Sequence, residues 1–174
     1  RGLAWTSVGG DTLQIEVNVM PGDGKLQMTG QMGDVMKESA QIALTYVRSV
    51  ADRYGVESRY FKEHDLHLHI PEGAVPKDGP SAGITMATAM LSAVTAKTVC
   101  ASVAMTGEIT WRGRVRPIGG LKEKTLAARM AHMKKVLVPD KNRPDMAEIS
   151  KEITKGMEIV FVKTMDDVVR EAFV

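Results

Sequence analysis

One serine stands where a nucleophile could be activated. Ser81 directly follows Asp78-Gly79-Pro80, which is turn chemistry, and residues 81–96 are small or apolar with neither charge nor proline. The pattern predicts a helix over 81–96 with Ser81 at its mouth. Backbone N–H groups at a helix N-terminus stabilise negative charge and could hold the oxyanion of an acyl-transfer reaction. An ordinary helix-capping serine would stand at the same position, so these residues alone leave both interpretations open.

A lysine in a second predicted helix could be the base for that serine. Gly119-Gly120 precedes a predicted helix over 121–133, whose two lysines fall on different faces at ~100° per residue. Lys124, unlike Lys122, shares its face with small and apolar residues, which are Leu121, Ala127, Ala128 and Ala131. Burial there would lower the pKa of Lys124 from ~10.4, and a neutral lysine can act as general base for a serine. The alternative is a solvated lysine whose stem covers the alanines.

Three further residues are candidates for supporting roles. Thr106 ends an apolar stretch at a Thr-Gly-Glu turn, where its hydroxyl could orient the lysine or be an ordinary strand side chain. Asp78 could form an ion pair with Lys77 or Lys124, although an Asx turn is the simpler interpretation. The backbone of Asp78 and Gly79 could shape an oxyanion hole next to Ser81.

Two other chemistries are weakly supported. Among His64, Asp65, His67 and His69, the pair His67 and His69 shares one face of a predicted strand, as in an HxH zinc pair. His64 has the other parity and no Glu or Cys follows at a metal-binding spacing, so we expect no metal and expect the pair to support the 71–80 loop. The segment 22–25 (GDGK) is not a phosphate loop, because a leucine stands where Ser or Thr is required. We therefore expect no bound nucleotide.

Composition narrows the class of protein. The 174 residues are 44% hydrophobic, and 23 basic against 21 acidic side chains give a net charge of +2, which is too balanced to favour nucleic acid or an anionic membrane. A single cysteine, Cys100, excludes an internal disulfide and fits a reducing compartment. No apolar stretch is long enough to span a bilayer. Because the chain starts without methionine, we expect it to be a piece of a longer protein.

Apolar periodicity predicts strands alternating with helices. The predicted strands are 12–20, 25–29, 65–70, 101–106, 135–138 and 158–162, the first two joined as a hairpin by the turn at 21–24. The predicted helices are 33–54, 81–96, 121–133, 142–150 and 164–172. In the second of these, Ser81, Thr85, Thr88, Ser92 and Thr95 form one mildly polar stripe on an otherwise apolar helix. We therefore predict one compact α+β (mixed α/β) domain over 1–174, with helices packed on a partly parallel sheet.

Several long motifs follow one another along nearly the whole chain. They are 2–6 (GLAWT), 30–40 (GQMGDVMKESA), 67–73 (HLHIPEG), 76–83 (PKDGPSAG), 105–109 (MTGEI) and 119–124 (GGLKEK). In this order they resemble the proteolytic domain of bacterial ATP-dependent Lon proteases. The resemblance implies a Lon-type peptidase fold and a serine endopeptidase in which Ser81 is the nucleophile and Lys124 the base.

The resemblance also implies what surrounds this domain. ATP and Mg²⁺ would be used by a preceding ATPase domain outside these 174 residues, so no cofactor or metal is expected here. The full-length protein would be a cytoplasmic hexameric ring that degrades unfolded or damaged proteins, and this domain would need neither nucleic acid nor membrane. Two alternatives stay open: a Lon-like ring-forming or binding module without peptidase activity, and a metal-dependent hydrolase that uses the histidine cluster. The presence of both Ser81 and Lys124 argues against the first.

Overall fold

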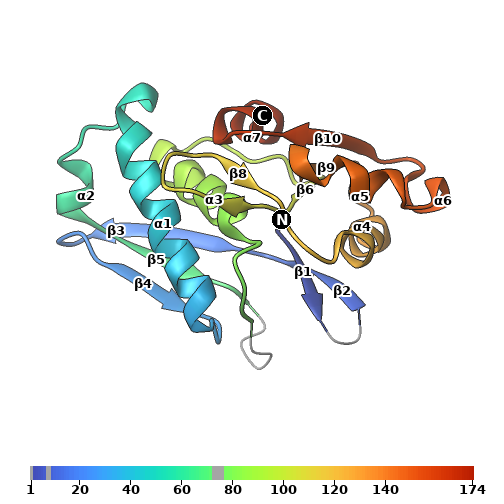
Figure 1. Cartoon of the computed structure of the whole chain (residues 1–174). Helices are drawn as coiled ribbons and strands as arrows, with labels where there is room; N and C mark the ends of the chain where they lie inside the picture. Colours follow the sequence, from blue (N-terminus) through green and yellow to red (C-terminus); the bar gives the residue numbers. More distant parts are fainter. Residues whose placement is uncertain (1, 7–8, 72–76) are drawn as a thin grey trace.

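Two β-sheets and the helices packed on them make up the fold (Figure 1). The structure, a computed structural model, describes residues 2–6, 9–71 and 77–174, with 2–6 and 9–11 described by their backbone alone. The larger sheet has the strand order β10-β9-β6-β1-β2 and the smaller sheet the order β3-β5-β4. The predicted mixed α/β architecture with a partly parallel sheet is confirmed, although the strands divide between two sheets and a short ribbon.

The larger sheet is parallel except at one edge. Its strands are β1 (Gly2–Thr6), β2 (Gly9–Leu13), β6 (Val103–Met105), β9 (Lys135–Pro139) and β10 (Glu158–Val162). All neighbouring pairs are parallel apart from β1 and β2, which are antiparallel. Because side chains alternate along a strand, the two faces of this sheet belong to different apolar clusters. On β6, Val103 and Met105 join the main core, while Ala104 joins the second cluster.

Helices cover both faces of the larger sheet. α3 (Gly83–Thr95) and α7 (Met165–Ala172) contribute to the main core, and α4 (Leu121–Met130) packs in the second cluster, next to α5 (Arg143–Ala147) and α6 (Lys151–Thr154). α4 ends before the predicted residue 133 because His132 adopts the left-handed conformation, with φ of 58°. The predicted helix over 142–150 is only partly present, as the 3₁₀ turn η2 (Asp140–Asn142) followed by α5.

The smaller sheet corrects the predicted hairpin. β3 (Glu16–Pro21) and β4 (Leu26–Thr29) do not pair with each other, because β5 (His64–His69) lies between them, antiparallel to β3 and parallel to β4. The predicted strand over 12–20 is also interrupted at Gln14 and Ile15, and its two parts enter different sheets. Local alternation could not reveal this arrangement, since the partner strand lies some 40 residues away in sequence.

Asp65 on β5 holds the connection between β3 and β4. Its Oδ1 accepts hydrogen bonds from the backbone N–H groups of Asp23, Gly24 and Lys25 at 3.0, 3.0 and 2.8 Å. These bonds lower the pKa of the Asp65 carboxyl, because they stabilise its charged form. One carboxylate on the central strand thus fixes the turn between the two outer strands.

The first long helix of the chain packs with α3 over the smaller sheet (Figure 1). The predicted helix over 33–54 is confirmed as α1 (Asp34–Val50) followed by the 3₁₀ turn η1 (Ala51–Tyr54), and it buries the face that carries Met36, Ala40, Ala43, Val47 and Val50. The strand β1 was not predicted. Four further short elements were also not predicted, because they are too brief to show periodicity: α2 (Tyr60–Glu63), α6, and the two strands β7 (Glu108–Ile109) and β8 (Val115–Arg116).

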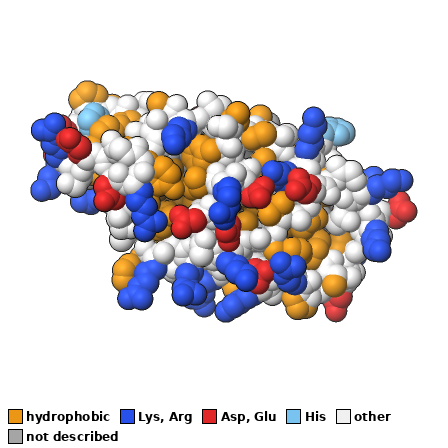
Figure 2. All heavy atoms as spheres, turned by 90° about the horizontal axis from the view of Figure 1, so that it is seen from above, with side chains coloured by type: hydrophobic (Ala, Val, Ile, Leu, Met, Phe, Trp, Pro, Cys, Tyr) orange, Lys and Arg blue, Asp and Glu red, His pale blue; other side chains and the backbone are white. Residues whose placement is uncertain are grey.

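The surface mixes both signs of charge. On the face seen in Figure 2, basic and acidic side chains are interspersed, with apolar side chains exposed between them. Among the helices of the described residues, none has the length and apolar character needed to cross a membrane.

Candidate active site

Ser81 lies in the turn that leads into α3. The helix starts at Gly83 and its N-cap residue is Ala82, with no side chain capping it, so the helix-capping interpretation of Ser81 does not apply. The carbonyl of Ser81 accepts the N–H of Gly107 at 2.8 Å, and the N–H of Ile84 donates to the carbonyl of Gly107 at 3.2 Å. Two backbone hydrogen bonds therefore fasten the half-buried Ser81 turn to the segment that follows β6.

Two glycines allow this turn to form. Gly79 has a φ of +109°, a conformation that side chains with a Cβ rarely adopt. At Gly83 the constraint is space, because an added Cβ would lie 2.7 Å from Cγ2 of Ile109 and 2.9 Å from its backbone nitrogen. The first turn of α3 thus packs directly against the β7 strand.

Asp78 connects the Ser81 turn to the start of α1. Its Oδ1 accepts the N–H of Met36 at 2.9 Å and that of Gly79 at 2.8 Å. The N-cap residue of α1 is Gly33, which has no capping side chain, and a Cβ there would lie 2.3 Å from Cγ of Asp78. The Asp78 carboxylate thus caps α1 from a distant part of the chain. Hydrogen bonds, chiefly from Met36 and then Gly79, lower the pKa of Asp78.

Asp78→Asn is expected to lower the melting temperature at pH 7 by about 2–4 °C, because an amide replaces the charged acceptor at the helix N-terminus. The folded-state pKa lies below the usual 3.8. The stabilisation is therefore complete above about pH 4 and is lost as the pH falls through the lower folded-state pKa. Thermal unfolding at pH 7 and at pH 2.5 should show the difference between variant and parent shrinking in acid.

The matched control for this prediction is Asp23→Asn. Its exposed carboxylate faces Lys25 at 3.9 Å, an ion pair of the kind that contributes little. An equal loss of stability in both variants, or a loss in Asp78→Asn that persists unchanged in acid, would contradict the capping role.

Lys124 is buried, whereas Lys122 is exposed. Only 4% of Lys124 is accessible to solvent, and it shares the buried face of α4 with Leu121, Ala127 and Ala128, as the sequence predicted. Burial lowers the pKa of the Lys124 ammonium from 10.5 to about 8, although the nearby Glu123 charge partly opposes this change. The Nζ atom donates a hydrogen bond to the carbonyl of Gly119 at 2.9 Å. At pH 7–8 the neutral fraction of Lys124 is therefore far larger than that of an ordinary lysine.

The Ser81 turn and α4 both contact β6 or the residues that follow it. Ala104 packs with α4 in the second cluster, and the fully buried Thr106 follows two residues later, with its N–H bonded to the carbonyl of Leu137 at 3.1 Å. The Thr106 hydroxyl lies 3.5 Å from the carbonyl of Ser81, at the limit of a hydrogen bond. Among the described residues, no hydrogen bond joins Ser81 Oγ to Lys124 Nζ. Catalytic hydrogen bonds are often long before substrate binds.

Two glycine carbonyls that sequence reasoning missed hold candidate site residues in place. Gly107 accepts a hydrogen bond from the first turn of α3, and Gly119 accepts one from Lys124. Backbone atoms carry no residue signature. The one available signal was the Gly119-Gly120 pair before α4, where Gly120 adopts a left-handed φ of 67° and turns the chain into the helix.

The histidines are engaged within the fold. The hydroxyl of Thr29 on β4 lies 2.9 Å from His67 Nε2 and 2.6 Å from His69 Nδ1, and His64 stacks on Tyr60. The shared strand face of His67 and His69 is confirmed. Both rings contact Thr29 on the neighbouring strand, while residues 72–76 of the loop they were expected to support lie outside the described residues. Within the described residues, no group of three or more His, Cys, Asp or Glu side chains could hold a metal ion.

Comparison with known proteins gives one consistent family. The family model that describes the Lon protease (S16) C-terminal proteolytic domain matches residues 1–174. The chain is 67% identical to the Lon protease of Lachnoclostridium phytofermentans and 57% identical to Lon protease 1 of Myxococcus xanthus, each over 173 residues. It is 53% identical to Lon protease 1 of Bacillus subtilis. These matches cover 99% of this chain but only 21–22% of each relative, so the chain spans about a fifth of their length.

Proposed function

Because this chain belongs to the family of Lon protease (S16) C-terminal proteolytic domains, we propose that it hydrolyses peptide bonds with a Ser81–Lys124 dyad. The observation that carries the proposal is Lys124: a lysine held away from water on a helix face, with its pKa lowered to about 8. A lysine with such a pKa can accept a proton near neutral pH, which an exposed lysine cannot do efficiently. Ser81, fastened to the end of β6, is the serine that the same region presents.

The reaction starts when neutral Lys124 takes the proton of Ser81 Oγ. The oxygen attacks the carbonyl carbon of the scissile peptide bond and forms a tetrahedral oxyanion. The Lys124 ammonium then protonates the leaving amine, and an ester between Ser81 and the acyl part of the substrate remains. Lys124, neutral again, removes a proton from water, which attacks the ester and releases the acid with Ser81 restored. During these steps the Gly119 carbonyl accepts one N–H of Lys124 and so restricts the directions that its lone pair can take.

Backbone geometry narrows the choice of oxyanion donors. Pro80 has no N–H, and the N–H of Gly79 donates to the Asp78 carboxylate at 2.8 Å. We therefore assign the oxyanion donor role first to the N–H of Ser81. Asp78 supports the site by holding its turn against α1, and Thr106 does so from the end of β6, where its hydroxyl faces the Ser81 carbonyl.

The longer protein is proposed to supply what this domain lacks. In that proposal a separate ATPase domain uses ATP and Mg²⁺ to unfold substrates, the subunits form a cytoplasmic hexameric ring, and unfolded or damaged proteins enter its chamber. The length of the relatives leaves room for such a domain, since this chain covers about a fifth of them. The domain itself is proposed to act without nucleic acid, membrane or cofactor.

A covalent probe tests the proposed chemistry directly. A fluorophosphonate that reacts with activated serines should label the 174-residue chain once, at Ser81, as located by peptide mass spectrometry. The chain should also cleave a short unstructured fluorogenic peptide slowly, at a rate that neither ATP nor a chelator changes. Absence of both labelling and cleavage at high protein concentration would favour the ring-forming or binding module, and loss of cleavage in the chelator would favour a metal-dependent hydrolase.

A further inference from the structure

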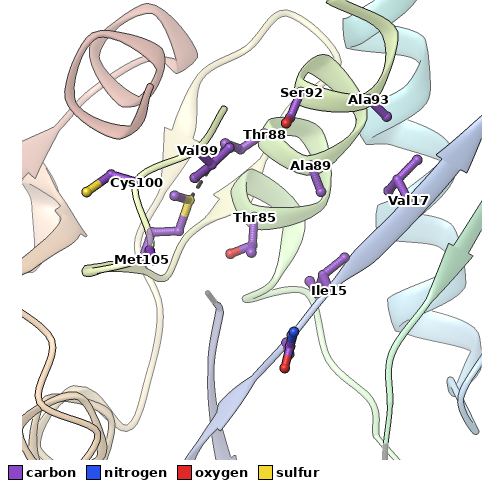
Figure 3. A pocket seen from close by; sticks show the side chains of 12 residues that line it. Ile15, Val17, Thr85, Thr88, Ala89, Ser92, Ala93, Val99, Cys100 and Met105 are labelled. Carbon is purple, nitrogen blue, oxygen red and sulfur yellow. Dashed lines mark hydrogen bonds between the residues drawn. The ribbon is translucent and has the colours of Figure 1, made fainter. Parts of the chain in front are cut away.

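A cavity of about 360 Å³ lies along α3, beyond the Ser81 turn (Figure 3). Thr85, Thr88 and Ser92 form its α3 wall, which is part of the polar stripe seen in the sequence. Ile15 and Val17 face them from the start of β3, and Met105 at the end of β6 closes another side. The volume falls within the range of small-molecule sites in proteins.

Among the described residues, the cavity wall carries one buried side-chain oxygen without a hydrogen-bond partner. Thr85 is 5% exposed, and within the described residues its Oγ1 has no hydrogen bond. The other two hydroxyls of the α3 wall donate to backbone carbonyls, Thr88 to Ile84 at 2.7 Å and Ser92 to Lys97 at 2.6 Å. A buried hydroxyl without a partner is costly and calls for an explanation.

The hydrogen bonds around Ser81 explain why the Thr85 hydroxyl has no partner. In a helix, a threonine hydroxyl can donate to the carbonyl four residues earlier, as Thr88 does, and for Thr85 that carbonyl belongs to Ser81. That carbonyl already receives the N–H of Gly107 at 2.8 Å and faces the Thr106 hydroxyl at 3.5 Å. The bonds that fasten the Ser81 turn therefore leave the Thr85 hydroxyl to point into the cavity (Figure 3).

We propose that this cavity binds an uncharged, mostly apolar small molecule, which pairs one hydrogen-bonding group with Thr85 Oγ1. No acidic, basic or histidine side chain is among the described residues that line the cavity, so phosphates, carboxylates and cations would find no counter-charge. Apart from the hydroxyls of α3, the carboxamide of Gln14 and the thiol of Cys100, the lining is aliphatic or thioether. The site is separate from the proposed peptidase chemistry and does not depend on it.

Binding of a defined probe tests this inference. N-benzylacetamide is neutral, has an apolar ring and carries one amide, while 3-phenylpropionate has a similar size but a negative charge. In a methyl-detected NMR titration of the 174-residue chain, N-benzylacetamide should shift the Met105, Thr85 and Ala89 methyl signals saturably. The carboxylate should leave them unchanged. Absence of a saturable shift with the amide, or equal shifts with both probes, would overturn the proposal.

Variants on α3 distinguish the contribution of the Thr85 hydroxyl to binding from that of the cavity volume. Thr85→Val should weaken the affinity for N-benzylacetamide about tenfold, the scale of one hydrogen bond, without lowering the melting temperature. Ala89→Trp should fill the cavity and abolish saturable binding. The matched control is Thr95→Val, because the Thr95 hydroxyl donates to the Leu91 carbonyl at 2.5 Å and is not part of the cavity wall. Its affinity should equal that of the parent.

A crystal structure of the chain soaked in the probe gives an independent readout. Density for the amide beside Thr85 Oγ1 would support the site. An ordered water alone, or a segment of a neighbouring copy filling the cavity, would overturn it. Thr85→Val binding the probe as tightly as the parent would also overturn the assigned hydrogen bond.

Discussion

Ser81→Ala is expected to reduce kcat/KM for an unstructured peptide by about 10⁴-fold or more, because removing a nucleophile disables every step that depends on it. The fold should survive. The contacts that fasten this turn involve the backbone carbonyl of Ser81 rather than its hydroxyl, and the Ser81 side chain does not cap α3, whose N-cap residue is Ala82. The free energy of unfolding should change by less than about 1 kcal/mol. Initial rates with a fluorogenic peptide, together with thermal unfolding, measure both effects.

A matched serine variant controls for losses of activity that arise from purification or handling. Ser49→Ala removes a hydroxyl that donates to the Tyr46 carbonyl at 2.6 Å on α1, away from the proposed site. This control should keep its activity. If Ser81→Ala retained more than trace hydrolysis while remaining folded, Ser81 would not be the nucleophile.

Lys124→Met is expected to lower kcat/KM by about 10²–10⁴-fold, the usual contribution of a positioned general base. In the parent protein, kcat/KM should rise with pH through about 8, the pKa that burial gives this lysine, and the variant should lose that rise. Lys124→Arg should be inactive as well, because arginine stays protonated. Lys122→Met is the matched control, since Lys122 is exposed on the same helix and should keep most of the activity.

The same variant makes a separate prediction for stability. The folded-state pKa of Lys124 lies below its unfolded value of ~10.4, so the unfolded chain binds more protons at this group between about pH 8 and 10.4. The free energy of unfolding of the parent should therefore rise across that window, and Lys124→Met should lack the rise and melt higher at pH 7.

Equal losses of activity in the Lys122 and Lys124 variants, or the same pH dependence of activity in the parent and Lys124→Met, would show that Lys124 is not the base.

The sequence predicted what depends on local pattern. The amphipathic period of 33–54 predicted α1, and the periodicity of 121–133 placed Lys124 on the alanine-lined face, although it left open whether that lysine is buried or solvated. Both results come from residues three or four positions apart, whose relative placement a helix fixes by itself. The helix predicted over 81–96 is present as α3 for the same reason, although it starts at Gly83.

Contacts between distant segments could not be predicted in this way. The Asp78 carboxylate caps α1 across 42 residues, and the Thr85 hydroxyl lacks a partner because of a bond made by Gly107. The placement of β5 between β3 and β4 has the same origin. Each depends on which segments meet in space, and a single sequence shows no period or motif for that.

The position of β5 has a consequence for how this chain reaches its fold. β3 and β4 are complete by residue 29, yet neither has its partner until residues 64–69 exist, and Asp65 closes loops of 40–42 residues on the turn between them. Such pairing raises the contact order. The entropic cost of closing these loops precedes the hydrogen bonds that compensate for it, and this slows folding. A nascent chain stopped before residue 64 would expose two unpaired strand edges and invite aggregation. Folding of this region during synthesis therefore begins only once β5 has left the ribosome.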